Sequence, residues 1–398
     1  MVLFKKEELS LLWPFYLDAF ISSIFLFMPV FIVVYFRDLG LSLFQISFLT
    51  TMMLLFTILF EIPTGAFADL YGRKTSVLLG SLIQGVSMLA IFFLRSYPAL
   101  LVAFSFIGIG STFNSGAREA WVTDFLKKKN KNLLHSYFAK ADSIRSTGIV
   151  LSGALGALLV RHFGVSIIWI ASGASFFITL ILLTFAKEHF LRREVKLKES
   201  FSSLKNQSIT SLKYVRANPV LFPFLIAISI FVFAGIFNGD MSWVTLLQEL
   251  NLPVHYFGYM WSAMGIIGIF APLISLKLMK QSKEKKFILI AILLTALSTS
   301  MIIFAKTIIS ALLVLLFSLF FISMSSPAER VYFHRFLSSK LRATIGSIES
   351  MLMGIIGVIA LPLTGLSIDL IGARNTIFLS AFLMLPSLII FLKIKEAK

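Results

Sequence analysis

The chain has 398 residues, of which 58% are hydrophobic and 14% charged, and its 36 Lys and Arg residues against 19 Asp and Glu give a formal net charge of +17. A water-soluble domain is about half apolar and about a quarter charged, so this composition excludes a soluble globular protein and indicates that lipid surrounds most of the surface. The absence of Cys excludes disulfides and thiolate metal sites.

Long apolar segments follow one another along the chain. A helix needs roughly 20 apolar residues to cross a hydrocarbon core of about 30 Å. The predicted helices cover residues 11–36, 43–68, 75–95, 99–126, 135–161, 165–186, 219–249, 254–279, 286–305, 308–337, 342–370 and 375–393. Strands of a membrane β-barrel would be about ten residues long with alternating polarity, which these segments are not. The first run lacks a short core with a cleavage site, so we expect it to be retained. The sequence predicts an all-α integral membrane protein with twelve transmembrane helices.

The basic residues are distributed very unevenly between the two sides of the predicted membrane. When both termini are placed on one side, nearly all Lys and Arg outside the helices fall on that side. The opposite loops hold only Arg37, Arg95, Arg161, Lys306 and Arg374. Basic loops stay in the cytoplasm, so we expect a multi-pass protein of the cytoplasmic (inner) membrane with both termini cytoplasmic. Membrane orientation accounts for the positive charge, and no nucleic acid partner is expected.

A polar stretch divides the predicted helices into six and six. We expect residues 1–186 and 219–398 to form two pseudo-symmetric six-helix bundles, and residues 187–218 to form a cytoplasmic amphipathic linker. The halves resemble each other locally, because Ser115-Gly-Ala-Arg-Glu119 in the fourth helix is followed 211 residues later by Ser326-Pro-Ala-Glu-Arg330 in the tenth. A match in both position and topology favours an internal duplication.

A loop motif follows the second predicted helix: Gly65-Ala-Phe-Ala-Asp69-Leu-Tyr-Gly72-Arg73-Lys74. Gly65 would permit close helix packing, Asp69 would cap the helix end and Gly72 would turn the chain, while the two cations would anchor the loop at the cytoplasmic face. The motif resembles the loop signature of the major facilitator superfamily, GxxxDxxGRK, with Leu70 where that family usually has a basic residue. Arg342-Ala-Thr-Ile-Gly346-Ser347, at the start of the eleventh helix, also resembles the family.

The resemblance implies the fold of that superfamily, in which two paired halves rock about a site near the middle of the membrane. It implies that Asp69 lies at the N-terminal end of the eleventh helix, where the helix dipole favours a carboxylate. It also implies that Arg73 pairs with Asp124, so that together they form a latch that closes the cytoplasmic side. Gly148, Gly153 and Gly156 stand where exporters of the family carry a Gly-rich element, although close helix packing explains small residues equally well.

Charged residues inside membrane helices are costly and indicate function. The predicted helices contain Asp18, Glu61, Arg118, Glu119, Asp240, Glu329, Arg330 and Glu349. We predict a cytoplasmic gate in which the fourth and tenth helices pair across the halves, Arg118 with Glu329 or Glu119 with Arg330. The alternative is that these four residues form fixed ion pairs.

Asp18 and Asp240 have no basic neighbour in sequence. An unpaired carboxyl in the membrane can bind a proton on one side and release it on the other, so we expect both in a proton-coupling or substrate cavity, with Asp18 preferred. Tyr16, Asn238 and Trp243 would add an aromatic, sparingly polar wall. In the alternative, Asp18 bonds a buried hydroxyl or Arg and serves packing, and the aromatic side chains face lipid.

These observations favour a secondary active transporter, specifically an antiporter that couples protons or another ion to the efflux of amphiphilic small molecules. We expect it to act as a monomer in the bilayer and without a cofactor. An importer of a small polar solute in the same fold remains the main alternative. An enzyme is not expected, since the five His residues are dispersed, and the predicted latch argues against a channel. The sequence also lacks a phosphate-binding GxxxxGK[ST] loop, so ATP is not expected to drive it.

Overall fold

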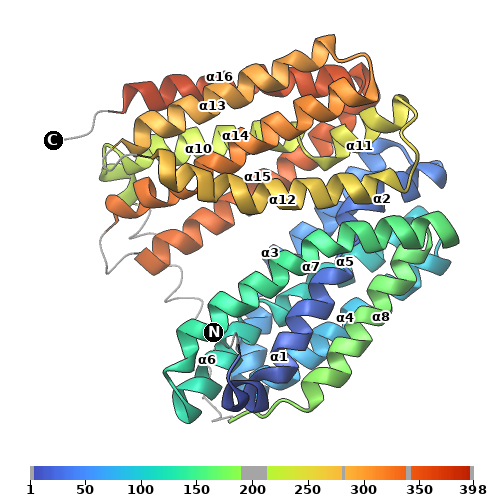
Figure 1. Cartoon of the computed structure of the whole chain (residues 1–398), viewed down its shortest axis with the longest axis vertical. Helices are drawn as coiled ribbons and strands as arrows, with labels where there is room; N and C mark the ends of the chain where they lie inside the picture. The colour runs from blue at the N-terminus through green and yellow to red at the C-terminus, as the bar shows by residue number, and fades with distance from the viewer. Residues whose placement is uncertain (1–3, 190–212, 280–282, 338–341, 395–398) are drawn as a thin grey trace. The chain divides into compact units, whose positions relative to one another are not determined.

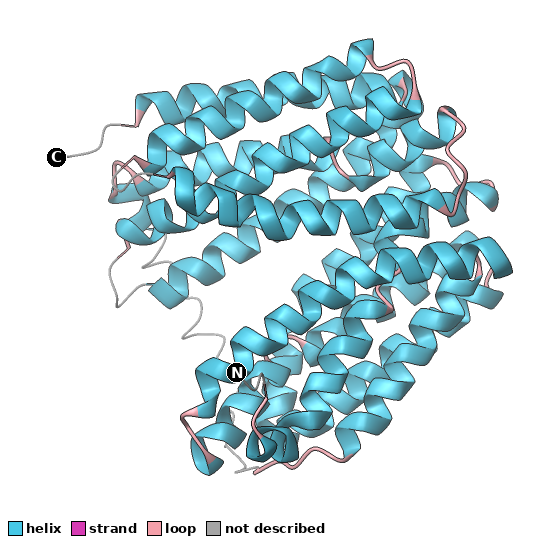
Figure 2. Ribbon diagram, viewed as in Figure 1, coloured by secondary structure: helices cyan, strands magenta, loops and turns pink. Residues whose placement is uncertain are grey.

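The computed structural model describes residues 4–189, 213–279, 283–337 and 342–394, and every regular element in this part of the chain is a helix (Figure 2). The helices are labelled in Figure 1. Their bounds are α1 Lys6–Ile24, α2 Met28–Asp38, α3 Leu43–Tyr71, α4 Arg73–Phe93, α5 Tyr97–Asn114, α6 Ala117–Lys129, α7 Leu133–Phe163, α8 Ile167–Thr184, α10 Leu221–Phe237, α11 Asp240–Glu249, α12 Tyr256–Leu278, α13 Glu284–Ser300, the 3₁₀ turn η1 Met301–Phe304, α14 Ile308–Arg335, α15 Arg342–Ile371 and α16 Ala373–Lys393.

The described residues contain 12 helical segments that are long and apolar enough to cross a membrane. This confirms the predicted all-α membrane fold. Most of the predicted amphipathic linker, residues 190–212, lies outside the described residues.

Three of the predicted spans were expected to be continuous and are instead broken in two. The first divides into α1 and α2, the fourth into α5 and α6, and the seventh into α10 and α11. Gly116, with φ of +64°, makes the second break, in a conformation that favours glycine. Asn238 and Gly239 make the third.

The break between α1 and α2 lies just before Pro29, which is the second residue of α2. Proline has no N–H and fits the first turn of a helix, where no intrahelical acceptor is needed, so α2 can begin here. Other prolines of the chain, such as Pro14 and Pro327, lie inside helices without ending them. At the break, the carbonyl oxygen of Phe25 accepts a hydrogen bond from Ser172 Oγ of α8 at 3.1 Å. Broken helices inside a membrane need such partners, because lipid offers none to a freed carbonyl.

The helices pack into two units. The first comprises Met1–Tyr35, Met52–Leu197 and Val254–Ser262, and the second comprises Phe36–Thr51, Lys198–Pro253 and Ala263–Lys398. These units differ from the predicted sequence halves, because the first turns of α3 pack with the second unit and the first turns of α12 pack with the first. Thus α3 and α12 each contribute to both units.

Aromatic residues join separate helices in the buried core of each unit. In the first unit, the rings of Phe15 and Trp121 meet edge to face with centroids 5.0 Å apart. In the second, Phe224 of α10 packs on Tyr332 of α14 and Phe391 of α16. These contacts join α1 to α6, and α10 to α14 and α16, and so hold together helices that are distant in sequence.

The glycines of α7 serve close packing, as the alternative interpretation expected. A β-carbon on Gly148 would overlap the side chain of Ser23 on α1, and one on Gly153 would overlap the carbonyl oxygen of Gly258 on α12. Ser262 Oγ, one turn further along α12, donates to Val150 O at 2.6 Å. Small residues let these backbones approach, which is their common use between membrane helices.

A buried ion pair that the sequence analysis did not identify joins α1 to α7. Glu8 is 1% exposed and accepts hydrogen bonds from Lys140 Nζ at 2.6 and 2.8 Å. The hydroxyl of Tyr16 donates to the same carboxylate at 2.6 Å. The residues are 132 positions apart, so sequence proximity gives no hint of the contact.

Lys140→Met is expected to lower the free energy of unfolding by about 3–5 kcal/mol, because it strands the buried Glu8 carboxylate without its counter-charge. Unfolding of the purified protein in detergent measures the change. Arg145→Met is the matched control, since Arg145 pairs with the exposed Asp142 at 3.3 Å and should contribute less than about 1 kcal/mol. Equal losses of unfolding free energy in the two variants would show that the Glu8–Lys140 pair stabilises the protein no more than the exposed Arg145–Asp142 pair does.

Candidate functional site

Asp18 of α1 forms an ion pair with Arg118 of α6, in which Oδ2 and Nη1 are 3.0 Å apart. Asp18 is 1% exposed, and its Oδ1 accepts no hydrogen bond from the described residues. Asp18 has no basic neighbour in sequence, but Arg118, 100 positions away, supplies a basic partner, so the contact with an Arg that the alternative named is present. The physical reason is the break at Gly116, since it restarts the chain as α6 with Arg118 in the first turn. The role of Asp18 in proton coupling stays a prediction.

A chain of polar side chains leads away from this ion pair. Arg118 Nη2 donates to Asn114 Oδ1 at 3.4 Å, and Asn114 Nδ2 donates to Gln84 Oε1 at 2.7 Å. The chain passes from α6 across the break to α5 and on to α4. Because each group orients the next one, a change in the charge of Asp18 can alter the orientation of the Gln84 amide.

Gln84 is also in the wall of a cavity of about 190 Å³ in the first unit. The cavity lies at the break between α1 and α2 and is lined mainly by aromatic, methionine and small hydroxyl side chains. These residues are Ser22, Phe25, Leu26, Phe27, Met28, Met53, Thr57, Gln84, Met88, Ile107, Ser111, Ser172, Ser175 and Phe176. An apolar cavity with a few convergent polar groups is the usual form of a small-molecule site.

The other residues predicted for the cavity lie elsewhere. The Tyr16 hydroxyl is bound to Glu8. In the second unit, Trp243 Nε1 donates to Asn238 Oδ1 at 3.0 Å, and Asn238 Nδ2 donates to Thr299 Oγ1 at 3.5 Å, so both side chains secure the break before α11. Asp240 is half-buried at the first position of α11. The cavity of the first unit is lined instead by residues that the sequence analysis did not select. Their grouping within the predicted helices is the only signal of the cavity that the sequence carries.

The predicted gate residues differ in their surroundings. Glu119 and Arg330 are exposed, and Glu329 Oε1 accepts a hydrogen bond from Ser325 Oγ at 2.5 Å. Glu329, Arg330 and Glu349 line a pocket of about 350 Å³ in the second unit. The pairing of the fourth and tenth helices across the halves stays a prediction. The resemblance between the two segments is not matched locally, because Gly116 breaks its helix whereas Pro327 lies inside α14.

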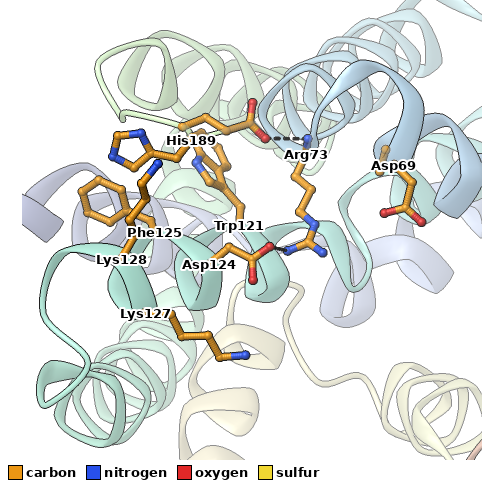
Figure 3. Close-up of a pocket in the computed structure, with 10 residues that line it drawn as sticks. Asp69, Arg73, Trp121, Asp124, Phe125, Lys127, Lys128 and His189 are labelled. Atoms are coloured by element: carbon orange, nitrogen blue, oxygen red, sulfur yellow. Dashed lines mark hydrogen bonds and ion pairs between the residues drawn. The ribbon is translucent and has the colours of Figure 1, made fainter. Parts of the chain in front are cut away.

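Arg73, which follows the turn at the end of α3, forms with Asp124 of α6 the ion pair that the resemblance implied. Figure 3 shows Arg73 and Asp124 pointing toward one another, joined as an ion pair, beside a pocket of about 360 Å³ that Asp69 also lines. Gly72 has a φ of +99°, which suits the sharp turn. The close packing expected at Gly65 is absent, since no described atom lies within 4 Å of the place of its β-carbon.

Two further contacts hold this loop, and neither was expected. Glu188 Oε1 accepts the backbone N–H groups of Arg73 at 2.7 Å and Lys74 at 3.1 Å, where a carboxylate is favoured at the start of α4. Lys74 Nζ donates to the carbonyl oxygens of Thr184 at 2.7 Å and Ala186 at 2.8 Å, at the end of α8. The loop is therefore fastened to its own unit on both flanks.

Arg73→Ala is expected to reduce transport roughly five- to 150-fold while the protein remains in the membrane. A charge-assisted hydrogen bond is worth about 1–3 kcal/mol, and its loss changes the populations of the two transport states rather than substrate contacts. Transport per molecule in vesicles, normalised by immunoblot, measures the effect. Lys128→Ala, in the wall of the same pocket, is the control. Full transport by Arg73→Ala would contradict the latch role.

Comparisons with known proteins show the family and the fold of the chain. The family model of the Major Facilitator Superfamily matches residues 16–360. The chain is 22% identical over 285 residues to an uncharacterised MFS-type transporter, MJ1560, of Methanocaldococcus jannaschii. That match covers 67% of this chain and 73% of the relative. It is 26% identical over 215 residues to the multi-drug resistance efflux pump PmrA of Streptococcus pneumoniae, about half of each protein. The crystal structure of the nucleoside transporter NupG superposes with a TM-score of 0.79 at 11% identity over 97% of this chain and 99% of NupG.

Proposed function

Because this chain belongs to the Major Facilitator Superfamily, and is therefore a secondary transporter of small molecules rather than an enzyme, we propose that it exports amphiphilic compounds across the cytoplasmic membrane in exchange for protons. The observation that carries the proposal is the continuous polar path in the first unit. It leads from the buried Asp18–Arg118 pair, through Asn114, to the Gln84 amide in the cavity wall.

This path supplies a means of coupling. Binding of a proton neutralises Asp18 and removes the charge that holds Arg118 at 3.0 Å. Arg118 is then free to change its bond to Asn114, which orients Gln84. Substrate at the cavity and proton at Asp18 thus act on the same chain of hydrogen bonds from opposite ends, which is what an exchange of one for the other requires.

The cavity indicates the class of substrate. An apolar protein cavity of about 150 Å³ can bind benzene. A cavity of about 190 Å³ with Phe and Met side chains therefore accepts one aromatic ring, and Gln84 and the nearby hydroxyls offer hydrogen bonds to a polar substituent. The flexible, polarisable methionines Met53 and Met88 suit substrates of varied shape.

The orientation and direction of transport also belong to this proposal. The excess of Lys and Arg supports cytoplasmic termini. The partial match to PmrA supports export, since that relative is named as an efflux pump. We propose that a monomer performs the cycle.

Transport in inside-out vesicles tests the proposal. With an acid interior, the reconstituted protein should drive accumulation of chloramphenicol, a neutral amphiphile with a single aromatic ring, and an uncoupler should abolish it. Accumulation of small polar solutes such as nucleosides or pentoses by right-side-out vesicles, without any movement of the amphiphile, would identify an importer instead.

A further inference from the structure

A second copy of the loop motif stands at the end of α15. The sequence Gly365-Leu-Ser-Ile-Asp369-Leu-Ile-Gly372-Ala-Arg374 repeats the Gly, Asp, Leu and Gly of the first motif and ends in a cation at the same place. Every matched residue lies 300 positions after its counterpart, so Asp369 corresponds to Asp69 and Arg374 to Lys74.

The two copies also have the same local structure. Gly72 and Gly372 both have positive φ, +99° and +83°, so the chain turns in the same manner after each helix. Arg374 Nη1 donates to the carbonyl oxygens of Ile302, at 3.0 Å, and Ala305, at the end of η1. Lys74 donates to Thr184 O and Ala186 O in the corresponding way. In each unit a cation after the glycine thus binds the carbonyl end of a neighbouring helix.

Asp369 makes contacts that show what the carboxylate of such a loop does. Its Oδ1 accepts the backbone N–H of Leu43 at 3.0 Å, and its Oδ2 accepts that of Phe44 at 2.8 Å. These are the first two residues of α3, whose first turns belong to the same unit as α15. A carboxylate at this position satisfies free N–H groups and interacts favourably with the helix dipole.

Gly365, one turn earlier on α15, permits this approach. A β-carbon there would overlap the carbonyl oxygen of Leu43 and the Ser47 hydroxyl. The glycine and the aspartate therefore bind the start of α3 together, Gly365 by close backbone contact and Asp369 by two charge-assisted hydrogen bonds.

The two motifs lie on opposite sides of the membrane. The motif at Gly65 follows the second span, and the motif at Gly365 follows the eleventh. Nine spans, the third to the eleventh, lie between them, and an odd number of crossings places the two motifs on opposite sides. Each of α3 and α15 ends in a carboxylate, and Asp369 of α15 caps the start of α3. The resemblance implies the reverse contact on the other side, with Asp69 of α3 at the start of α15.

We propose that Asp369 is a positioning residue of the transport cycle: it caps α3 and holds the side of the molecule that bears Arg37 and Arg374 closed, in alternation with Asp69 on the cytoplasmic side. The proposal rests on alternating access and not on the substrate or the coupling ion. The second motif has Ala373 where the first has Arg73, so it lacks the ion pair with an acid like Asp124. The contacts of Asp369 and Gly365 with the start of α3 therefore carry this latch without such an ion pair.

Distances between spin labels test the proposal without substrate or gradient. The chain has no Cys, so labels can be placed without background. One labelled pair, Ser96→Cys and Lys306→Cys, reports on the Arg374 side, and the other, Lys129→Cys and Lys286→Cys, reports on the cytoplasmic side. All four positions are exposed, and each pair joins the two units.

Asp369→Asn is expected to lower the population with the Arg374 side closed by about tenfold, the size of a typical coupling between two states. Asp69→Asn should shift the populations in the opposite direction. The double variant should return toward the wild-type distribution. Gly365→Ala should act like Asp369→Asn, because it separates the same two helices, and gives a second reading if Asp369→Asn fails to fold. Asp38→Asn, an exposed acid on the same side, is the control.

The proposal is overturned if Asp369→Asn and Gly365→Ala leave both distance distributions unchanged, or if they shift them in the same direction as Asp69→Asn. The proposed export of amphiphiles can fail independently, because the spin-label distances are measured without a transported compound. Conversely, an unchanged distribution in a protein that exports chloramphenicol would remove the second latch and leave the function in place.

Discussion

Asp18→Asn is expected to collapse transport driven by a pH gradient, by at least about tenfold and within the range of about five- to 150-fold that typifies coupling between two sites. Exchange of labelled for unlabelled substrate without a gradient should persist. The asparagine keeps the size of the side chain and can still accept a hydrogen bond from Arg118, but it can neither carry the charge nor take up a proton.

The position of Asp18 explains why gradient-driven transport should be lost while exchange persists. It is 1% exposed, its only observed ion pair among the described residues is with Arg118, and its Oδ1 accepts no hydrogen bond from them. A carboxyl so placed can change charge only by binding a proton, and it lies at one end of the path to the cavity. If Asp18 cannot bind and release a proton, the pH gradient cannot act on the hydrogen-bond path, whereas the cavity itself is intact.

Reconstituted vesicles distinguish the outcomes. Asp142→Asn is the matched control, because Asp142 is an exposed acid whose partner, Arg145, lies on the same helix. Full gradient-driven transport by Asp18→Asn would make Asp18 a packing residue and direct attention to Asp240 in the second unit.

Arg118→Met is expected to destabilise the folded protein by about 3–5 kcal/mol and to abolish transport. Removing the guanidinium leaves the Asp18 carboxylate in a dry interior without its ion-pair partner, which costs more than the pair contributed. It also cuts the path to Asn114. Unfolding in detergent and vesicle transport measure the two effects separately.

The double variant Asp18→Asn with Arg118→Met should recover most of the lost stability but no gradient-driven transport. Recovery follows because no charge is then buried, and transport stays absent because no group titrates there. Glu119→Gln, at the exposed neighbouring position, is the control and should change stability by less than about 0.5 kcal/mol. Unaltered stability in Arg118→Met would show that water or lipid headgroups already solvate Asp18.

The sequence alone determined the fold class, because hydrophobic length is a local property. A run of roughly 20 apolar residues indicates by itself that the segment lies in lipid. The twelve predicted spans match those of the described residues. The loop motif from Gly65 to Lys74 was also readable, since a turn glycine and adjacent cations act within a few residues of each other. The pairing of Arg73 with Asp124 followed from the family resemblance and is present.

Only the tertiary structure decided which charges meet. Asp18 and Arg118 are 100 positions apart, and Glu8 and Lys140 are 132 apart, so their pairing depends on where the broken helices place them. The break before Pro29 could not be read from the proline alone, because Pro327 lies inside α14 without breaking it, and the Ser172 hydroxyl that satisfies the freed carbonyl of Phe25 is distant in sequence. Nor could the second loop motif be interpreted by itself: its repeat is visible in the sequence, yet the role of Asp369 depends on two N–H groups of a helix that begins 326 residues earlier. Hydrophobic length is fixed by neighbouring residues, whereas the partner of a buried charge is chosen by packing between distant ones.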